Sequence, residues 1–175
     1  LAKSGATKYD RDTDEHYDLI SAYQKSMRGS DPDAALYYLA KILAAGDLPS
    51  ACRRLLVTAS EDVGLANPAV LPFVKACVDS ALMLGLPEAK IPLADAVVFV
   101  SISPKSNSAY IGIHKATADA ESGSSATVPR HLQNKHFDGD DAAVKGQFYK
   151  YPHDYKNHYV KQQYLPDEFK NSVYY

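Results

Sequence analysis

The stretch RGSDPDAALYYLAKILAAGD, residues 28–47, carries the markers of both ends of a helix. Asp31 precedes Pro32, and proline suits the first helical position because it has no N–H to lose there. Ser30 or Asp31 can accept hydrogen bonds from the free amides of the first turn. Gly46 supplies the left-handed residue that ends a helix. The stretch therefore predicts one helix, and none of its side chains is chemically reactive.

One face of this helix is apolar. The residues that form it recur at spacings of three and four: Ala35, Leu36, Leu39, Ile42 and Leu43. Tyr37, Tyr38 and Lys41 lie outside this stripe. We expect these three residues to be candidates for a contact between subunits.

Four further segments show a helical apolar pattern. They are residues 14–28, 47–62, 67–84 and 106–122. Tyr17 belongs to the stripe of the first, and Gly29 is expected to end that helix. Asn67 is predicted to cap the third of these helices, as Asp31 caps its own. Tyr110 and Ile113 belong to the stripe that we expect the last helix to turn inward.

Residues 91–103 are ambiguous. The run Val97-Val98-Phe99-Val100-Ser101-Ile102 has the composition of a strand. However, an unbroken apolar segment of about 11 to 12 residues fits a buried helix better than a strand of about 5 to 6. A lone strand would also have no partner among helices. We therefore predict a helix here, with a strand as the alternative.

The character of the chain changes after Gly123. This last part holds seven of the 13 tyrosines and four of the six histidines. Its aromatic content is too high for a disordered tail. We expect an extended segment strapped across the helices, with its rings in their grooves and a short helical turn near residues 129–134.

Composition and charge exclude several classes of protein. The chain has 19 basic and 21 acidic residues, whereas a dedicated nucleic-acid domain is strongly basic. Cys52 and Cys77 lie in apolar helical patterns and are expected to be buried free thiols rather than a disulfide scaffold. No apolar run approaches the length that spans a bilayer. Because residues 1–12 are small and polar, we expect them to form a linker or disordered lead-in. We also expect the chain to be a fragment of a longer protein.

Catalytic motifs are absent from the sequence. No G-x-x-x-x-G-K-S/T run is present, so nucleotide hydrolysis by these residues alone is not expected. The histidines of the last part lack metal-ligand spacing, and we interpret them as surface residues: His131, His136, His153 and His158. We predict no catalytic residue, no cofactor and no metal in this chain.

Two short polar groups interrupt the apolar helices. Glu61 and Asp62 are adjacent, so on a helix they point in different directions, and we interpret them as polar residues at a helix end. Lys105, Ser106 and Asn107 form a turn between two apolar helices. Most such turns only cap a helix, and we keep these three residues as candidate interaction residues.

Lysines and tyrosines alternate over residues 145–161, where Asp154 is the only acid. Basic groups that neutralise phosphates, together with rings that stack on bases, are how proteins hold single strands. Lys150, Tyr151 and Lys156 are therefore candidate contacts to single-stranded DNA. The alternative is that the rings pack inward and the lysines are merely solvated.

Several motifs, taken together and in order, resemble one family. They are EHYDLISA at residues 15–22, RGSDPDAALY at 28–37, ASEDVGLANP at 59–68, PKSNS at 104–108, YKYPHD at 149–154 and QYLPD at 163–167. The sequence is identified as a member of the replication-associated recombination protein A family (RarA, also called MgsA), kin to the eukaryotic Werner helicase-interacting protein. Tyr38 stands where relatives often have Trp.

The resemblance implies a clamp-loader-like AAA+ ATPase that acts in replication, recombination and repair at stalled forks. ATP and Mg are expected for the full-length protein, with the nucleotide site upstream of residue 1. The implied location is the bacterial cytoplasm, in association with the nucleoid. DNA and replication proteins such as single-stranded DNA-binding protein are the implied partners, and no membrane is involved.

We therefore expect an all-α fold, a multi-helix bundle like a clamp-loader collar with a largely irregular C-terminal segment packed on it. Residues 13–122 are predicted to be a helical domain that forms a homotetramer, and residues 123–175 a Tyr/His-rich segment of the same domain. The alternative function is a module that binds single-stranded DNA or a replication partner.

Overall fold

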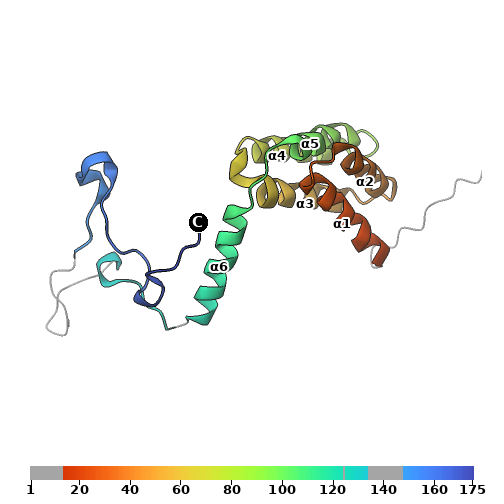
Figure 1. Ribbon diagram of the computed structural model, residues 1–175. Helices are drawn as coiled ribbons and strands as arrows, with labels where there is room; N and C mark the ends of the chain where they lie inside the picture. The colour runs from red at the N-terminus through yellow and green to blue at the C-terminus, as the bar shows by residue number, and fades with distance from the viewer. Residues whose placement is uncertain (1–13, 124, 134–147) are drawn as a thin grey trace, which may run out of the picture. The chain divides into compact units, whose positions relative to one another are not determined.

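The computed structural model describes residues 14–123, 125–133 and 148–175. The described residues form six α-helices, short 3₁₀ and π segments and no strand, which confirms the predicted all-α class. Contacts divide the chain into two compact units, residues 1–111 and 112–175, and each is described by itself. Helices α1 to α5 gather in the first unit (Figure 1). The predicted lead-in at residues 1–12 lies outside the described residues.

Helices α1 (Asp14–Arg28) and α2 (Pro32–Ala44) are joined by a tight turn. The Asp31 carboxylate accepts the amide of Ala34 at 2.9 Å, which confirms the predicted cap. Helix α1 ends at Arg28, so Gly29 closes it as expected, and the left-handed residue of the turn is Ser30, with φ of 61°.

Helix α3 (Leu48–Thr58) is capped by Asp47, whose carboxylate accepts the Ser50 amide at 3.3 Å. The prediction extended this helix to Asp62. Its α-helical geometry ends at Thr58, and the chain continues through one π-helical turn, η1 (Ala59–Val63), and a 3₁₀ turn, η2 (Gly64–Ala66). π-Helical turns are rare in proteins, and many of those that do occur within α-helices lie at functional sites.

Helix α4 (Val70–Leu84) starts two residues later than predicted. The predicted Asn67 side-chain cap is wrong. Asn67 instead uses its backbone carbonyl, which accepts the Val70 amide at 3.1 Å, so Pro68 lies in a turn before the helix. Gly85, with φ of 71°, ends α4 as expected.

Helix α5 (Lys90–Ile102) confirms the helical interpretation of the ambiguous segment and rules out the strand alternative. It contacts α1, α2, α3 and α4. A helix surrounded by others needs apolar residues on most of its circumference. The strand-like composition of this segment is therefore explained by burial.

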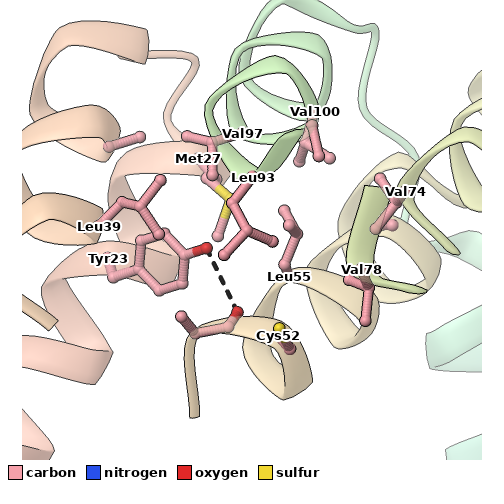
Figure 2. Close-up of a cluster of buried hydrophobic side chains, with 14 of the residues drawn as sticks. Tyr23, Met27, Leu39, Cys52, Leu55, Val74, Val78, Leu93, Val97 and Val100 are labelled. Carbon is pink, nitrogen blue, oxygen red and sulfur yellow. Dashed lines mark hydrogen bonds between the residues drawn. The ribbon is translucent and has the colours of Figure 1, made fainter. Parts of the chain in front are cut away.

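The core of the first unit lies where these helices meet (Figure 2). Every one of the five helices contributes fully buried side chains, among them Tyr23, Met27, Ile42, Leu55, Val74, Leu93 and Val97. The Tyr23 hydroxyl donates to the Ala51 carbonyl at 3.4 Å. Cys52 is buried beside this contact as a free thiol, as expected, and Cys77 is half-buried.

Helix α6 (Ser108–Ser122) differs from the prediction on burial. Gly112 is its one buried residue among those described. Tyr110 is 40% exposed and Ile113 is 63% exposed, and Tyr17 of α1 is 65% exposed. The periodic pattern identified an apolar face correctly, but the described chain does not cover that face.

The second unit contains the C-terminal part of α6 and irregular chain. Its described residues form four 3₁₀ turns: η3 (Arg130–Leu132), η4 (Pro152–Asp154), η5 (Lys156–His158) and η6 (Asp167–Phe169). The last residues pack on α6, where the Tyr174 hydroxyl donates to the Asp119 carboxylate at 2.8 Å. The rings of Tyr149 to Tyr164 remain exposed. The expectation that they fill grooves between the helices of residues 13–122 stays a prediction.

Candidate functional site

Three segments that are far apart in the sequence meet in the first unit. They come from the end of α1, from the π-helical turn η1, and from the turn before α6. Polar side chains connect them, and we call this cluster the polar junction: Arg28, Ser30, Asp62, Lys105 and Ser106. Its members belong to three of the motifs that carried the family resemblance.

An ion pair joins α1 to η1 in the polar junction. Arg28 Nε donates to Asp62 Oδ1 at 2.6 Å, and the Arg28 guanidinium lies 3.3 Å from Glu61 Oε1. The hydrogen bond to Asp62 raises the pKa of Arg28. The Asp62 side chain is 6% exposed, and its other oxygen, Oδ2, is buried without a hydrogen-bond partner among the described residues.

The ammonium group of Lys105 donates hydrogen bonds to other groups of the same chain. Its Nζ donates to Ser30 Oγ at 3.1 Å and to the carbonyls of Ser101 and Ser103 at 3.0 and 2.7 Å. Partial burial lowers the pKa of this ammonium group. An ammonium group has three protons to donate, so these three oxygens satisfy it.

Backbone contacts complete the polar junction. The Ser106 amide donates to the Asp62 carbonyl at 2.7 Å. A Cβ at Gly64 would lie 2.8 Å from the Ser106 carbonyl oxygen, closer than side chains approach, and the φ of Gly64 is +50°. Asn107 lies at the start of α6, where its carbonyl accepts the Ile111 amide at 2.9 Å. The arrangement fixes the position at which α6 begins and offers no activated nucleophile.

A second candidate surface lies on α2. Tyr37 is 59% exposed, and Lys41 lies 5.9 Å from the centre of its ring. Tyr38 meets the Tyr37 ring edge-on and is partly buried against the core. An apolar groove of about 480 Å³ runs beside this surface, lined by Leu36, Leu39, Ala40, Leu43, Ala44, Leu86, Pro87, Lys90 and Ala94.

The end of α4 and the turn that follows it expose large apolar side chains. Met83 is 87% exposed, Leu82 and Leu84 are more than half exposed, and Leu86 also reaches into the groove. Exposed apolar residues that follow one another in this way mark binding surfaces. Sequence periodicity did not single them out as an exposed row.

The third candidate set lies in the second unit. Lys150, Tyr151 and Lys156 are exposed in an irregular loop. The Gln162 side-chain amide closes this loop, because it accepts the Lys150 amide at 3.1 Å and donates to the Lys150 carbonyl at 2.8 Å. Lys145, which began the predicted basic segment, lies outside the described residues, as does His136.

The family profile described as MgsA AAA+ ATPase C terminal matches residues 29–175. The chain belongs to this MgsA family. The chain is 53% identical to the replication-associated recombination protein A of Bacillus subtilis over 167 aligned residues. The aligned region covers 95% of this chain and 40% of the relative. The Escherichia coli protein of the same name is 40% identical, and the aligned region covers all of this chain and 40% of the length of that protein.

A eukaryotic relative matches as well. The Dictyostelium discoideum protein named ATPase WRNIP1 is 33% identical over 95% of this chain and 19% of its own length. The chain thus spans about two fifths of the bacterial relatives and a fifth of this one. The kinship to Werner helicase-interacting protein that the motifs indicated is confirmed.

The MgsA family is one of AAA+ ATPases. The sequence has no phosphate-binding loop of the G-x-x-x-x-G-K-S/T kind. In the described ranges, no three His, Cys, Asp or Glu side chains come together as metal ligands. None of the described helices combines the length and apolar character needed to cross a membrane.

Sequence reasoning did not find the partners within the polar junction. Arg28 and Asp62 are 34 positions apart, and Lys105 and Ser30 are 75 apart. The Gly-Ser-Asp-Pro, Ser-Glu-Asp-Val-Gly and Pro-Lys-Ser-Asn motifs were each noticed as family features. The only signal that they belong together was that all three are polar groups at helix ends in an apolar domain.

Proposed function

We propose that this chain is the non-catalytic oligomerisation region of an MgsA-family AAA+ ATPase and that it assembles the protein into a homotetramer. The observation that carries the proposal is the row of exposed apolar side chains at the end of α4, from Leu82 to Leu86. Apolar area in water is unfavourable by about 25 cal/mol per Å². Covering this row with another copy of the chain removes that cost.

The described helices support this interpretation in a second way. The first unit already buries a core contributed by five helices, so the exposed row is not needed for folding. The α2–α5 groove lies next to it and shares Leu86 with it. A surface that pairs projecting apolar residues with a groove is suited to association with itself, and closed symmetric assemblies are the usual result.

The activity of the whole protein belongs to the same proposal. The full-length protein would bind ATP and Mg in a region outside this chain, and would act on DNA at stalled replication forks. Single-stranded DNA-binding protein is a proposed partner, and the bacterial cytoplasm and nucleoid the proposed location. The motif resemblance, the family match and the lack of a phosphate-binding loop in this chain support this division of roles.

A charge placed in the exposed row tests the proposed interface. Leu84→Glu should lower the association constant of the chain at least ten-fold, because a carboxylate would be buried in an apolar contact. Leu65→Glu is the matched control, since Leu65 of η2 is 59% exposed, close to the 54% of Leu84. Sedimentation equilibrium measures both variants. Equal association by the two variants would exclude the α4 end as the interface.

A further inference from the structure

A loop in the second unit has a fixed shape although it lies outside any helix. Residues 150–162, which we call the tail loop, contain the turns η4 and η5. The side-chain amide of Gln162 pairs with both backbone groups of Lys150 and also donates to the Tyr164 hydroxyl at 2.9 Å. One side chain thus joins the two ends of the loop.

The backbone of the tail loop is strained at two neighbouring residues. Asn157 and His158 have φ of 60° and 54°, in the left-handed region. A residue other than glycine pays a cost in this region, and such strain persists where the surrounding structure requires it. The second of these residues, His158, has its ring next to the ring of His153.

Three rings follow one another in the tail loop. The centres of the His158 and His153 rings are 4.8 Å apart, and those of His153 and Tyr151 are 5.1 Å apart. All three residues are exposed, and Tyr151 is 53% exposed. The rings therefore form a short platform that presents aromatic surface to solvent instead of burying it.

The tail loop that carries these rings also has an excess of positive charge. The tail loop holds three lysines, Lys150, Lys156 and Lys161, and one acid, Asp154. Each lysine is exposed, and none takes part in a salt bridge among the described residues. The chain as a whole has a formal charge of −2, so this excess of positive charge is local.

We propose that the tail loop is a binding site for single-stranded nucleic acid, with bases stacked on Tyr151, His153 and His158 and phosphates held by the lysines. Stacking requires a free base face, which a single strand offers and a duplex does not, and exposed rings between basic residues are the arrangement that supplies it. An apolar protein partner fits less well, because Val160 is the only aliphatic residue other than proline in the loop. The proposal rests on the proposed action of the full-length protein on DNA, and it is independent of oligomerisation.

Fluorescence anisotropy of a labelled oligothymidylate, titrated with the whole chain, tests the proposal. Tyr151→Ala with His158→Ala should weaken binding roughly five-fold or more and leave the salt dependence unchanged. Lys150→Ala with Lys156→Ala should instead reduce the slope of log K against log salt by about 0.7 for each phosphate that the lysines no longer neutralise. Gln162→Ala, which retains every ring and lysine, should weaken binding because the loop opens.

The matched control changes the same residue types elsewhere. Tyr17 and Lys25 are exposed on α1, and Tyr17→Ala with Lys25→Ala should bind like the unmodified chain. Circular dichroism of each variant verifies that the helices remain folded. The proposal is overturned if the chain does not bind at low salt, if the control variant binds as weakly as the loop variants, or if inorganic polyphosphate competes equally well and the ring variants bind normally.

Discussion

Asp62 is the residue on which the polar junction depends. It receives the Arg28 side chain on one carboxylate oxygen, and its carbonyl accepts the Ser106 amide. Glu61 next to it also lies within reach of Arg28, but at 3.3 Å and with a more exposed side chain. The two neighbouring acids therefore differ in burial while sharing one partner.

We expect Asp62→Ala to lower the free energy of unfolding by about 1–3 kcal/mol, because the Arg28 guanidinium loses its buried acceptor. Glu61→Ala is the matched control and should cost less than about 1 kcal/mol, as exposed ion pairs do. Urea denaturation followed by circular dichroism measures both. Equal losses of stability in the two variants would mean that the junction contributes no more than a surface pair.

The buried Cys52 thiol should make the stability of the fold depend on pH in the alkaline range. Burial raises the pKa of its thiol from 9.0 to about 11. A group whose pKa is higher in the folded state than in the unfolded state contributes its full stabilisation below the unfolded-state pKa. This stabilisation is lost as the pH rises through the folded-state pKa. Denaturant titrations between pH 9 and 11 should therefore show falling stability, with a shallower fall for Cys52→Ala. Cys77→Ala, at a half-buried thiol, should change that slope less, and an unchanged slope in Cys52→Ala would refute the assignment.

At the scale of elements, the C-terminal residues lie so close to α6 that only glycine fits between them. A Cβ at Gly112 would stand 2.8 Å from the Tyr174 carbonyl oxygen. Asp119, two turns along α6, accepts both the Tyr174 and Ser172 hydroxyls. The hydrogen bond to Asp119 also raises the pKa of the Tyr174 phenol.

Gly112→Ala should therefore release the chain end while α6 stays helical, since alanine favours a helix by about 1 kcal/mol over glycine. Hydrogen exchange at the amides of residues 172–174 should become faster in this variant. Glu121→Ala changes an exposed side chain on the same helix and should leave that exchange unchanged. Protection that persists in Gly112→Ala would show that the backbone can move aside.

Helix prediction from the sequence worked where the signals were local. Asp31 caps α2 and Gly46 takes the left-handed conformation with φ of 77°, because both depend on neighbours within one turn. Asn67 looked like the same device and was not, because the residues before it had already entered a 3₁₀ turn. A capping pattern in the sequence does not show which backbone conformation the residues before the cap adopt.

The candidate sites were less predictable for the same reason. The lysine and tyrosine alternation located the tail loop, but the Gln162 closure spans 12 positions and the left-handed pair has no sequence signature as strong as glycine. The α6 stripe was identified as inward-facing, although periodicity shows only that a face is apolar. Whether that face is covered by the same chain is decided by tertiary structure.

At the scale of the whole molecule, the chain folds one helical core and leaves further apolar surface exposed. Leu82 to Leu86 and the groove beside α2 lie in the first unit, while the tail loop lies in the second. A tetramer would present four tail loops, and linked sites bind one polymer far more tightly than a single site does. The proposed assembly would therefore strengthen the proposed binding of a single strand without any new contact.

The measurement that tests the central claim most directly is the mass of the unmodified chain in solution, by light scattering or sedimentation equilibrium at tens of micromolar. The proposal predicts a particle of four chains, each of 19.1 kDa, that dissociates on dilution without populating larger species. A strict monomer throughout the concentration range would contradict it.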